Sequence, residues 1–285
     1  MTIAITGATG RLGGQVARAL ADLHPVLVVR DPAKAPELGG EVRQATYADG
    51  SACRAAFEGV DTLLLVSASE SADRREQHRT AIAAAAEAGV RQVVYTSFVG
   101  AAADATFTLG RDHHDAEQAI RESGMAHTFL RDSFYADVLP FYADASDVIR
   151  GPAGEGRVAA VARADVADAA AAVLTDPAAH AGATYEMTGP EALTFAEIAE
   201  RAGAVLGRAL RFEDESEDEA YRWRRERYGA AQWQLDAWVS TYIAIRDGAL
   251  ARVSDDVRRL TGHAPRTLEE ALASTSRLGA RIDRG

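Results

Sequence analysis

Cysteine and lysine are almost absent from this chain. The single cysteine, Cys53, cannot form an intrachain disulfide, which favours a reducing compartment and a cytoplasmic location. The single lysine, Lys34, would have to serve any chemistry that needs an amine side chain. No hydrophobic run approaches the roughly 18 apolar residues of a membrane span, and the first residues do not read as a signal peptide. We therefore expect neither a disulfide scaffold nor a membrane protein.

Positive charge is also in short supply. The 285 residues carry a formal net charge of −11 at pH 7. This balance disfavours a nucleic-acid partner and an anionic membrane surface. Hydrophobic residues make up 47% of the chain, enough for one large α/β domain with an added lobe.

Hydrophobic runs alternate with helical periodicity in the first part of the chain. The predicted strands are 2–6, 26–29, 42–44, 62–66, 92–96 and 127–130. Amphipathic stretches between them include the predicted helices 73–88 and 111–123. Strands that alternate with helices predict a doubly wound parallel sheet with right-handed crossovers.

The pattern changes after residue 131. Helices are predicted at 133–147 and 165–175, and strands at 158–161 and 184–187. Three later segments open with Ser/Thr-x-x-Glu, the capping-box pattern of a helix start: Thr194 with Glu197, Ser216 with Glu219, and Thr267 with Glu270. We expect an α/β domain over 1–188 and a smaller, mainly helical C-terminal lobe over 189–285.

A glycine-rich loop, "ITGATGRLGG" at 5–14, joins the first strand to the first helix. Amide groups at such a helix start suit a pyrophosphate, and glycines allow close backbone approach. The alternative is a glycine-rich turn that serves packing alone. We predict dinucleotide contacts from the loop residues Gly7, Thr9, Gly10, Arg11, Leu12 and Gly13.

The second predicted strand ends in "VLVVRDPAK". An acidic residue at this point usually binds the ribose 2′-hydroxyl of NAD, whereas arginine accommodates the 2′-phosphate of NADP. Arg30 and Lys34 therefore favour NADPH over NADH, and Asp31 keeps NAD open. A solvated charged turn is the alternative interpretation.

A polar pair is predicted on the buried face of the helix 111–123. His113 and Glu117 share a helix face with Ala116 and Ile120, and we expect this face to point to the sheet and the cofactor cleft. One interpretation makes His113 a proton donor oriented by the Glu117 carboxylate. The alternatives are a structural hydrogen bond, or a histidine that touches the cofactor without transferring a proton. No metal site is expected, because two ligands on one face are a weak signal.

The chain resembles the NmrA-like atypical short-chain dehydrogenases/reductases, especially their NAD(P)H:quinone oxidoreductase subgroup. The resemblance lies in the glycine loop, the end of the second strand and the helix 111–123, and in the segments "QHRTAIAAAAEAGV", "VVYTSFVGA", "HTFLRDSFYADVL" and "VARADVADAAAAVL". The resemblance covers roughly residues 3–175. It implies a Rossmann-type NAD(P)-binding domain over 1–188 and a C-terminal lobe over 189–285 that caps a substrate bound between them. It also implies cofactor contacts from Thr46, Tyr47, Ser67, Ala68, Ser69, Thr96, Ser97, Ser133, Tyr135 and Arg163.

The chain lacks the Tyr-x-x-x-Lys pair of ordinary short-chain dehydrogenases, because its one lysine, Lys34, lies in another element. It departs from the NmrA-like family in two places: Thr46 stands where an aspartate usually binds the adenine amine, and "RDSFY" stands where asparagine or glycine is common. The resemblance implies an NADPH-dependent reductase of a quinone or other conjugated carbonyl. A single dinucleotide fingerprint implies no flavin. The alternatives are a redox-sensing regulator that binds but does not consume the cofactor, and a tailoring reductase of a secondary metabolite. A homodimer is a further expectation. The C-terminal aromatic side chains are either lobe core or an apolar wall for an aromatic substrate; they are Tyr221, Trp223, Tyr228, Trp233, Trp238 and Tyr242.

Overall fold

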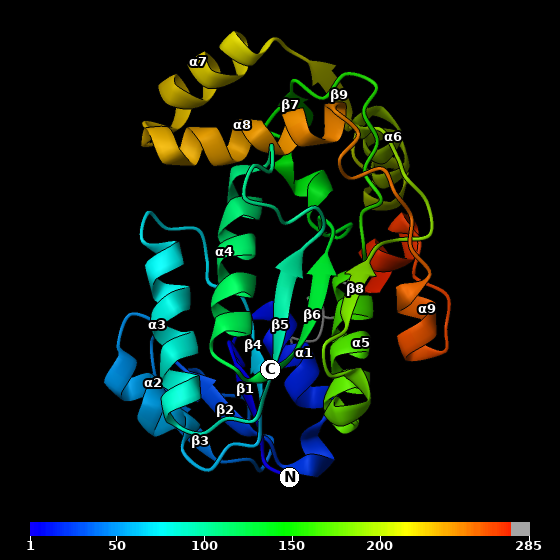
Figure 1. Ribbon diagram of the computed structural model, residues 1–285. Helices are drawn as coiled ribbons and strands as arrows, with labels where there is room; N and C mark the ends of the chain where they lie inside the picture. Colours follow the sequence, from blue (N-terminus) through cyan, green and yellow to red (C-terminus); the bar gives the residue numbers. More distant parts are fainter. Residues whose placement is uncertain (275–285) are drawn as a thin grey trace. The chain divides into compact units, whose positions relative to one another are not determined.

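A seven-stranded sheet lies at the centre of the first part of the chain (Figure 1). The computed structural model describes residues 1–274. The strand order is β3-β2-β1-β4-β5-β6-β8, and the pairs β1–β2, β1–β4, β2–β3 and β4–β5 are parallel. The order reverses between β1 and β4, which is the doubly wound arrangement. The strands are β1 (Ile3–Thr6), β2 (Val26–Val29), β3 (Val42–Gln44), β4 (Thr62–Leu65), β5 (Gln92–Phe98), β6 (Ala126–Asp132) and β8 (Thr184–Met187).

Helices cover this sheet because its central strands are apolar on both faces. Every residue of β1, β2, β4 and β5 is buried. Alternate strand residues pack against α2, α3 and α4 in one cluster around Phe57, Ile82 and Ile120. The first helices are α1 (Arg11–Ala19), α2 (Gly50–Phe57), α3 (Arg74–Glu87), α4 (Thr108–Glu122) and α5 (Arg163–Thr175).

Clustering of contacts divides the chain into two compact units. Unit 1 comprises Met1–Ala103, Arg111–Arg131 and Val166–Glu186, and unit 2 comprises Asp104–Gly110, Asp132–Asp165 and the chain from Met187. The expected domains, 1–188 and 189–285, stay a prediction. The end of the expected second domain, residues 275–285, lies outside the described residues.

Unit 2 contains a small parallel pair of strands, β7 (Val148–Gly151) and β9 (Arg211–Asp214). Its helices are α6 (Phe195–Leu206), α7 (Glu217–Tyr228), α8 (Gln232–Arg246) and α9 (Asp256–Thr261). Thr194–Glu197 and Ser216–Glu219 form the predicted capping boxes, and Thr267 and Glu270 exchange the same two hydrogen bonds. The predicted helical character of the chain after residue 188 is thus confirmed for residues up to 274.

Two predicted elements are wrong. The expected helix 133–147 is reduced to a 3-10 turn at Leu139–Tyr142, because Pro140 removes a backbone donor and Asp144 binds the Ser146 amide in place of a helical bond. The expected strand 158–161 makes only isolated bridges through Val158 and Val161. The remaining predicted strands and helices are confirmed within a few residues.

No helix among residues 1–274 is both long enough and apolar enough to cross a membrane.

Candidate functional site

The loop between β1 and α1 turns tightly at its first glycine. Gly7 has a φ of +62°, which glycine adopts without a side-chain penalty, and its carbonyl accepts a hydrogen bond of 2.7 Å from the Gly10 amide. A Cβ atom on Gly13 would lie 2.4 Å from the Gly7 oxygen. The glycines therefore let α1 begin against the end of β1, with Gly10 as its N-cap. The free amides of this helix end suit an anionic pyrophosphate.

A groove of about 390 Å³ opens over this loop. Its walls come from the segments that follow β1, β2, β3 and β4, because parallel strands all end at one edge of the sheet. The predicted cofactor contacts that line it are Gly7, Thr9, Gly10, Arg11, Leu12, Gly13, Arg30, Thr46, Tyr47, Ser67, Ala68 and Ser69. Glu70, Ser71 and Gln77 also line the groove and were not predicted. The only sequence signal for the first two was that they follow Ser69 directly.

The two cations after β2 lie in different surroundings. Arg30 lines the groove, and its carbonyl accepts a hydrogen bond of 2.9 Å from Gln44 Nε2. Lys34 ends the 3-10 turn Pro32–Lys34, is absent from the groove lining, and has its Nζ 3.5 Å from the Asp31 carboxylate. The structure thus places Arg30, and not Lys34, on the groove.

Tyr47 closes the groove from the β3 side. Its Oη lies 2.6 Å from Val66 O and 2.5 Å from Thr6 Oγ1, and burial raises the pKa of Tyr47 above its usual range. Asp49, the nearest carboxylate after Thr46, instead caps α2 by accepting a hydrogen bond of 2.9 Å from the Ala52 amide.

His113 faces the interior of unit 1, but it does not line the groove over the glycine loop, and its partners were not predicted. The side chain is buried, with Nε2 3.0 Å from Arg74 Nη2 and Nδ1 3.1 Å from Tyr95 Oη. Burial lowers the pKa of His113 well below its usual range, and the charge of Arg74 lowers it further. The ring is therefore neutral at physiological pH.

Glu117 is the centre of a separate ionic cluster in unit 1. Its oxygens accept hydrogen bonds from Ser97 Oγ at 2.6 Å, from Arg131 at 2.7 and 2.8 Å, and from Arg121 at 3.2 Å. Burial opposes ionisation, yet the bonds from Arg131 and Ser97 hold the pKa of Glu117 below its usual value. Among the described residues these partners take the place of His113, so the expected orienting contact is not formed.

Thr96 and Ser97, which the resemblance assigns to the cofactor, have other partners in unit 1. Thr96 Oγ1 accepts a hydrogen bond of 2.8 Å from the Ser67 amide, and Ser97 bonds to Glu117. Neither residue lines the groove. Thr96 holds a groove residue in place, and its direct contact with cofactor stays a prediction.

Ser133, Tyr135 and Arg163 gather in unit 2 around an unpredicted acid, Asp132. Tyr135 Oη donates to Asp132 Oδ2 at 2.9 Å, and Asp132 Oδ1 and Ser133 Oγ are buried with no hydrogen-bond partner among the described residues. Arg163 lies over the Tyr135 ring at 4.9 Å and pairs with Asp137 at 3.0 Å. Burial raises the pKa of Asp132 to about 8.

Comparison with known proteins decides the family. Residues 7–177 match a protein family described as NAD(P)H-binding. This chain belongs to that NAD(P)H-binding family.

Other proteins of known name match the chain over nearly its whole length. Quinone oxidoreductase 2 of Escherichia coli is 35% identical over 95% of this chain and 97% of that protein. The NAD(P)H azoreductase of Xenophilus azovorans is 34% identical over 98% and 99% of the two chains. A crystal structure of the Escherichia coli NADPH-dependent quinone oxidoreductase QOR2 with NADPH has a TM-score of 0.86 at 35% identity, covering 96% of this chain and 99% of that chain.

The groove fits the cofactor of the NAD(P)H-binding family. Gly10 leaves no side chain at the helix start, where an added Cβ would already lie 3.0 Å from the Gly7 oxygen. Arg11 and Arg30 place positive side chains on the same groove. The loop residues would hold a pyrophosphate, and Arg30 a 2′-phosphate.

Aromatic side chains of unit 2 divide between core and surface. Tyr242 is buried, whereas Tyr228 is 57% exposed. Tyr228 makes edge-to-face contacts with Trp223 and Trp238, at centroid distances of 5.7 and 5.6 Å. The predicted lobe core is thus confirmed for Tyr242, and an apolar substrate wall stays a prediction for the others.

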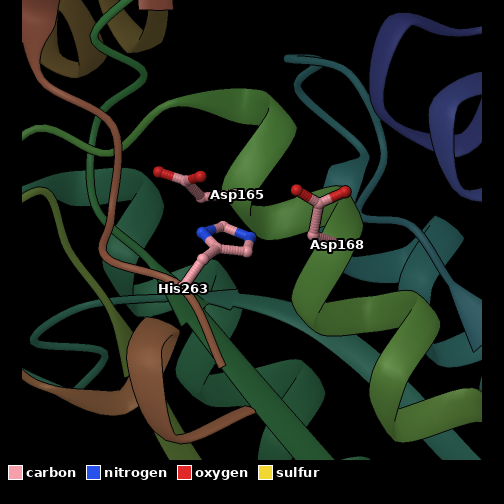
Figure 2. Close-up of side chains that lie close together, drawn as sticks. All are labelled: Asp165, Asp168 and His263. Carbon is pink, nitrogen blue, oxygen red and sulfur yellow. The ribbon is translucent and has the colours of Figure 1, made fainter. Parts of the chain in front are cut away.

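Asp165 and Asp168 lie one turn apart on α5, and Figure 2 shows both with His263 from the segment after α9. Arg266 binds both oxygens of Asp165, with its amide donating to Oδ2 at 2.7 Å and its guanidinium contacting Oδ1. Burial raises the pKa of Asp165. The Asp165 carboxylate therefore connects α5 to the segment around Arg266, and we assign no metal to it.

Proposed function

We propose that this NAD(P)H-dependent oxidoreductase reduces quinones or other conjugated carbonyls, with NADPH as its preferred cofactor and without flavin. Bound NADPH supplies the hydride. The observation that carries the proposal is the glycine-loop groove with Arg30 on its wall, in a chain that matches quinone and azo reductases from end to end.

The residues of the groove bind and orient the cofactor in this proposal. Amides at the start of α1 receive the pyrophosphate, and the Arg30 guanidinium receives the 2′-phosphate. Thr46 and Tyr47 lie where the adenine end would rest, and Ser67, Ala68 and Ser69 form the wall of the groove that follows β4. We propose Ser133, Tyr135 and Arg163 as contacts at the reactive end, on the resemblance alone.

A quinone needs little proton chemistry from the protein, because its negative charge is delocalised after reduction. His113 holds its one proton at Nδ1 toward Tyr95, and its lowered pKa opposes a second proton. Our proposal therefore takes the proton from water. Asp132 is a carboxyl group of unit 2 whose pKa, raised to about 8 by burial, keeps it protonated at neutral pH.

Turnover of NADPH with a panel of quinones tests the proposal. We expect NADPH absorbance to fall in step with quinone reduction, and NADH to be used less efficiently. Gly10→Val is the control, because a side chain there would obstruct the pyrophosphate without touching the substrate. Tight NADPH binding with no consumption across the panel would instead indicate the redox-sensing regulator.

The regulator and tailoring-reductase alternatives are not favoured, because two near-full-length relatives are named as a quinone oxidoreductase and an azoreductase. We include a small aromatic or quinone-like substrate, a homodimer and a cytoplasmic location in the proposal as expectations that await measurement.

A further inference from the structure

The segment between β4 and α3, residues 66–73, forms one wall of the groove without regular secondary structure. Residues 66–68 are half-buried, so their backbone groups need hydrogen-bond partners from elsewhere. Side chains provide them: Thr6 Oγ1 accepts from the Val66 amide at 2.9 Å, and Thr96 Oγ1 accepts from the Ser67 amide at 2.8 Å. The next residue, Ala68, is bonded on both of its backbone groups.

His78 on α3 holds the amide of Ala68. Its Nε2 accepts the hydrogen bond at 2.8 Å, and the imidazole is fully buried against the edge of the Tyr95 ring. A backbone amide can only donate, so Nε2 carries no proton and the ring is neutral. Burial lowers the pKa of His78 to about 3, with the charge of Arg74 acting in the same direction.

Arg74 on α3 holds the carbonyl of Ala68. Its Nε donates to Ala68 O at 2.9 Å, while Nη1 lies 3.5 Å from Asp112 and the side chain is only 5% exposed. Burying a guanidinium is costly unless its N–H groups are bonded. Its Nη2 is bonded to His113 Nε2, 3.0 Å away, whereas Nη1 has only the ionic contact with Asp112 and no hydrogen-bond partner among the described residues.

His113 is fixed in one tautomer by the same reasoning. Arginine can only donate, so His113 Nε2 accepts and Nδ1–H points to Tyr95 Oη at 3.1 Å. A path of hydrogen bonds thus runs from Tyr95 on β5 through His113 and Arg74 to Ala68 in the groove wall. All these residues belong to unit 1.

We propose that Arg74, His78 and His113 form a clamp that positions residues 66–73 for cofactor binding, so that His113 is a positioning residue that acts through Arg74. The inference rests on the proposed function only in taking the ligand to be NADP(H). The clamp assigns to His113 on α4 a structural role that does not require proton transfer.

Pairs of variants that keep or remove one hydrogen bond test the clamp. His78→Gln and His113→Gln retain an acceptor near Nε2, whereas His78→Leu and His113→Leu remove it; Arg74→Met removes both donors. We expect the leucine and methionine variants to raise the NADP⁺ dissociation constant roughly tenfold, and the glutamine variants to recover most of the affinity. Amide hydrogen exchange of ligand-free protein should accelerate at Ala68 in His78→Leu.

A proton-transfer role gives a different pattern. If His113 only positions Arg74, His113→Gln should keep saturated turnover within about twofold and leave the pH profile of kcat unchanged. The ratio of NADPH to NADH affinity should not move in any clamp variant, because Arg30 lies outside the clamp. A loss of saturated turnover of roughly a hundredfold in His113→Gln, with unchanged NADP⁺ affinity, would assign proton transfer to His113 instead.

Ligand-free exchange and NADP⁺ binding separate this inference from the proposed activity. Unchanged Ala68 exchange in His78→Leu, or unchanged NADP⁺ affinity in folded Arg74→Met, overturns the clamp. If His78→Leu does not fold, His78→Asn replaces it, because the shorter side chain stays polar but does not reach the Ala68 amide. If Arg74→Met does not fold, Arg74→Lys replaces it, because one ammonium keeps the charge but cannot make both guanidinium bonds. A wild-type protein that binds NADP⁺ but reduces no quinone contradicts the proposed function and leaves the clamp standing.

Discussion

At the scale of single residues, the cations after β2 can be told apart by their neighbours. Arg30 is on the groove wall, whereas Lys34 is exposed and paired with Asp31. An exposed ion pair contributes little to stability or binding. Cofactor choice should therefore depend on Arg30 alone.

We expect Arg30→Ala to reduce the preference for NADPH over NADH by about tenfold, because a charge-assisted contact to the 2′-phosphate is typically worth ~1.5–3 kcal/mol. Lys34→Ala is the matched control and should leave the preference nearly unchanged. Calorimetric titration of both cofactors into the wild type and the two variants measures this. Equal affinities of the wild type for NADPH and NADH would contradict the 2′-phosphate assignment.

The ionisation of Asp132 should make the free energy of unfolding depend on pH. Its pKa of about 8 lies above the ordinary aspartate value of about 4, so the folded state holds a proton that the unfolded state releases. The contribution of Asp132 to the free energy of unfolding therefore falls as pH rises from about 4 to about 8 and is constant above.

We expect Asp132→Asn, which cannot ionise, to remove this decline, so that its stability relative to the wild type improves with pH by a few kcal/mol across that range. Denaturant unfolding of both proteins at several pH values provides the comparison. Parallel stability curves would show that Asp132 is ionised in the folded protein.

At the scale of elements, two positions at the start of α1 require glycine for different reasons. A Cβ on Gly13 would lie 2.4 Å from Gly7 O and 2.8 Å from Thr6 O, so this glycine sets the distance between α1 and β1. Gly10 stands at the helix N-cap, on the groove. Gly13 therefore serves packing, and we propose that Gly10 serves the ligand.

We expect Gly13→Ala to destabilise the protein by ~1–3 kcal/mol through overpacking. Gly10→Val should instead abolish NADPH binding while the far-UV spectrum and unfolding midpoint stay close to the wild type. Thermal unfolding and cofactor titration of both variants separate the two roles. Wild-type NADPH affinity in Gly10→Val would mean that the loop is a packing turn.

At the scale of the whole molecule, the two units share elements along the chain. Helix α4 begins in unit 2 and continues into unit 1, and α5 does the same. All three tryptophans lie in unit 2, whereas the glycine-loop groove lies in unit 1. Tryptophan fluorescence therefore reports the unit that does not contain the loop.

We expect NADP⁺ to raise the unfolding midpoint seen by tryptophan fluorescence as much as that seen by far-UV circular dichroism, because elements shared by two units couple their unfolding. At a hundred times its dissociation constant a ligand adds about 2.7 kcal/mol. A fluorescence midpoint that ignores NADP⁺ while the dichroism midpoint rises would show that the units unfold independently.

Much of the fold could be predicted from local patterns. The strands of the sheet were recognisable because each is a short apolar run that ends in turn residues, and the capping boxes at Thr194 and Ser216 depend on residues only three apart. Strands β7 and β9 were missed because Arg150 and Glu213 interrupt the apolar pattern, and these side chains pair with each other across the two strands. This ion pair can be recognised only once the two strands are known to lie side by side.

By itself the sequence determined the glycine loop, the strand before it and Arg30 at the end of β2, since backbone conformation at glycine and hydrophobic periodicity are local properties. Only the tertiary structure decided what the buried polar side chains do. Glu117 is bonded to Ser97 and Arg131, and His113 to Arg74 and Tyr95, across separations of 14 to 39 residues. A buried charge or imidazole takes the partners that packing brings within about 3 Å, and helical spacing alone cannot reveal which elements those partners come from.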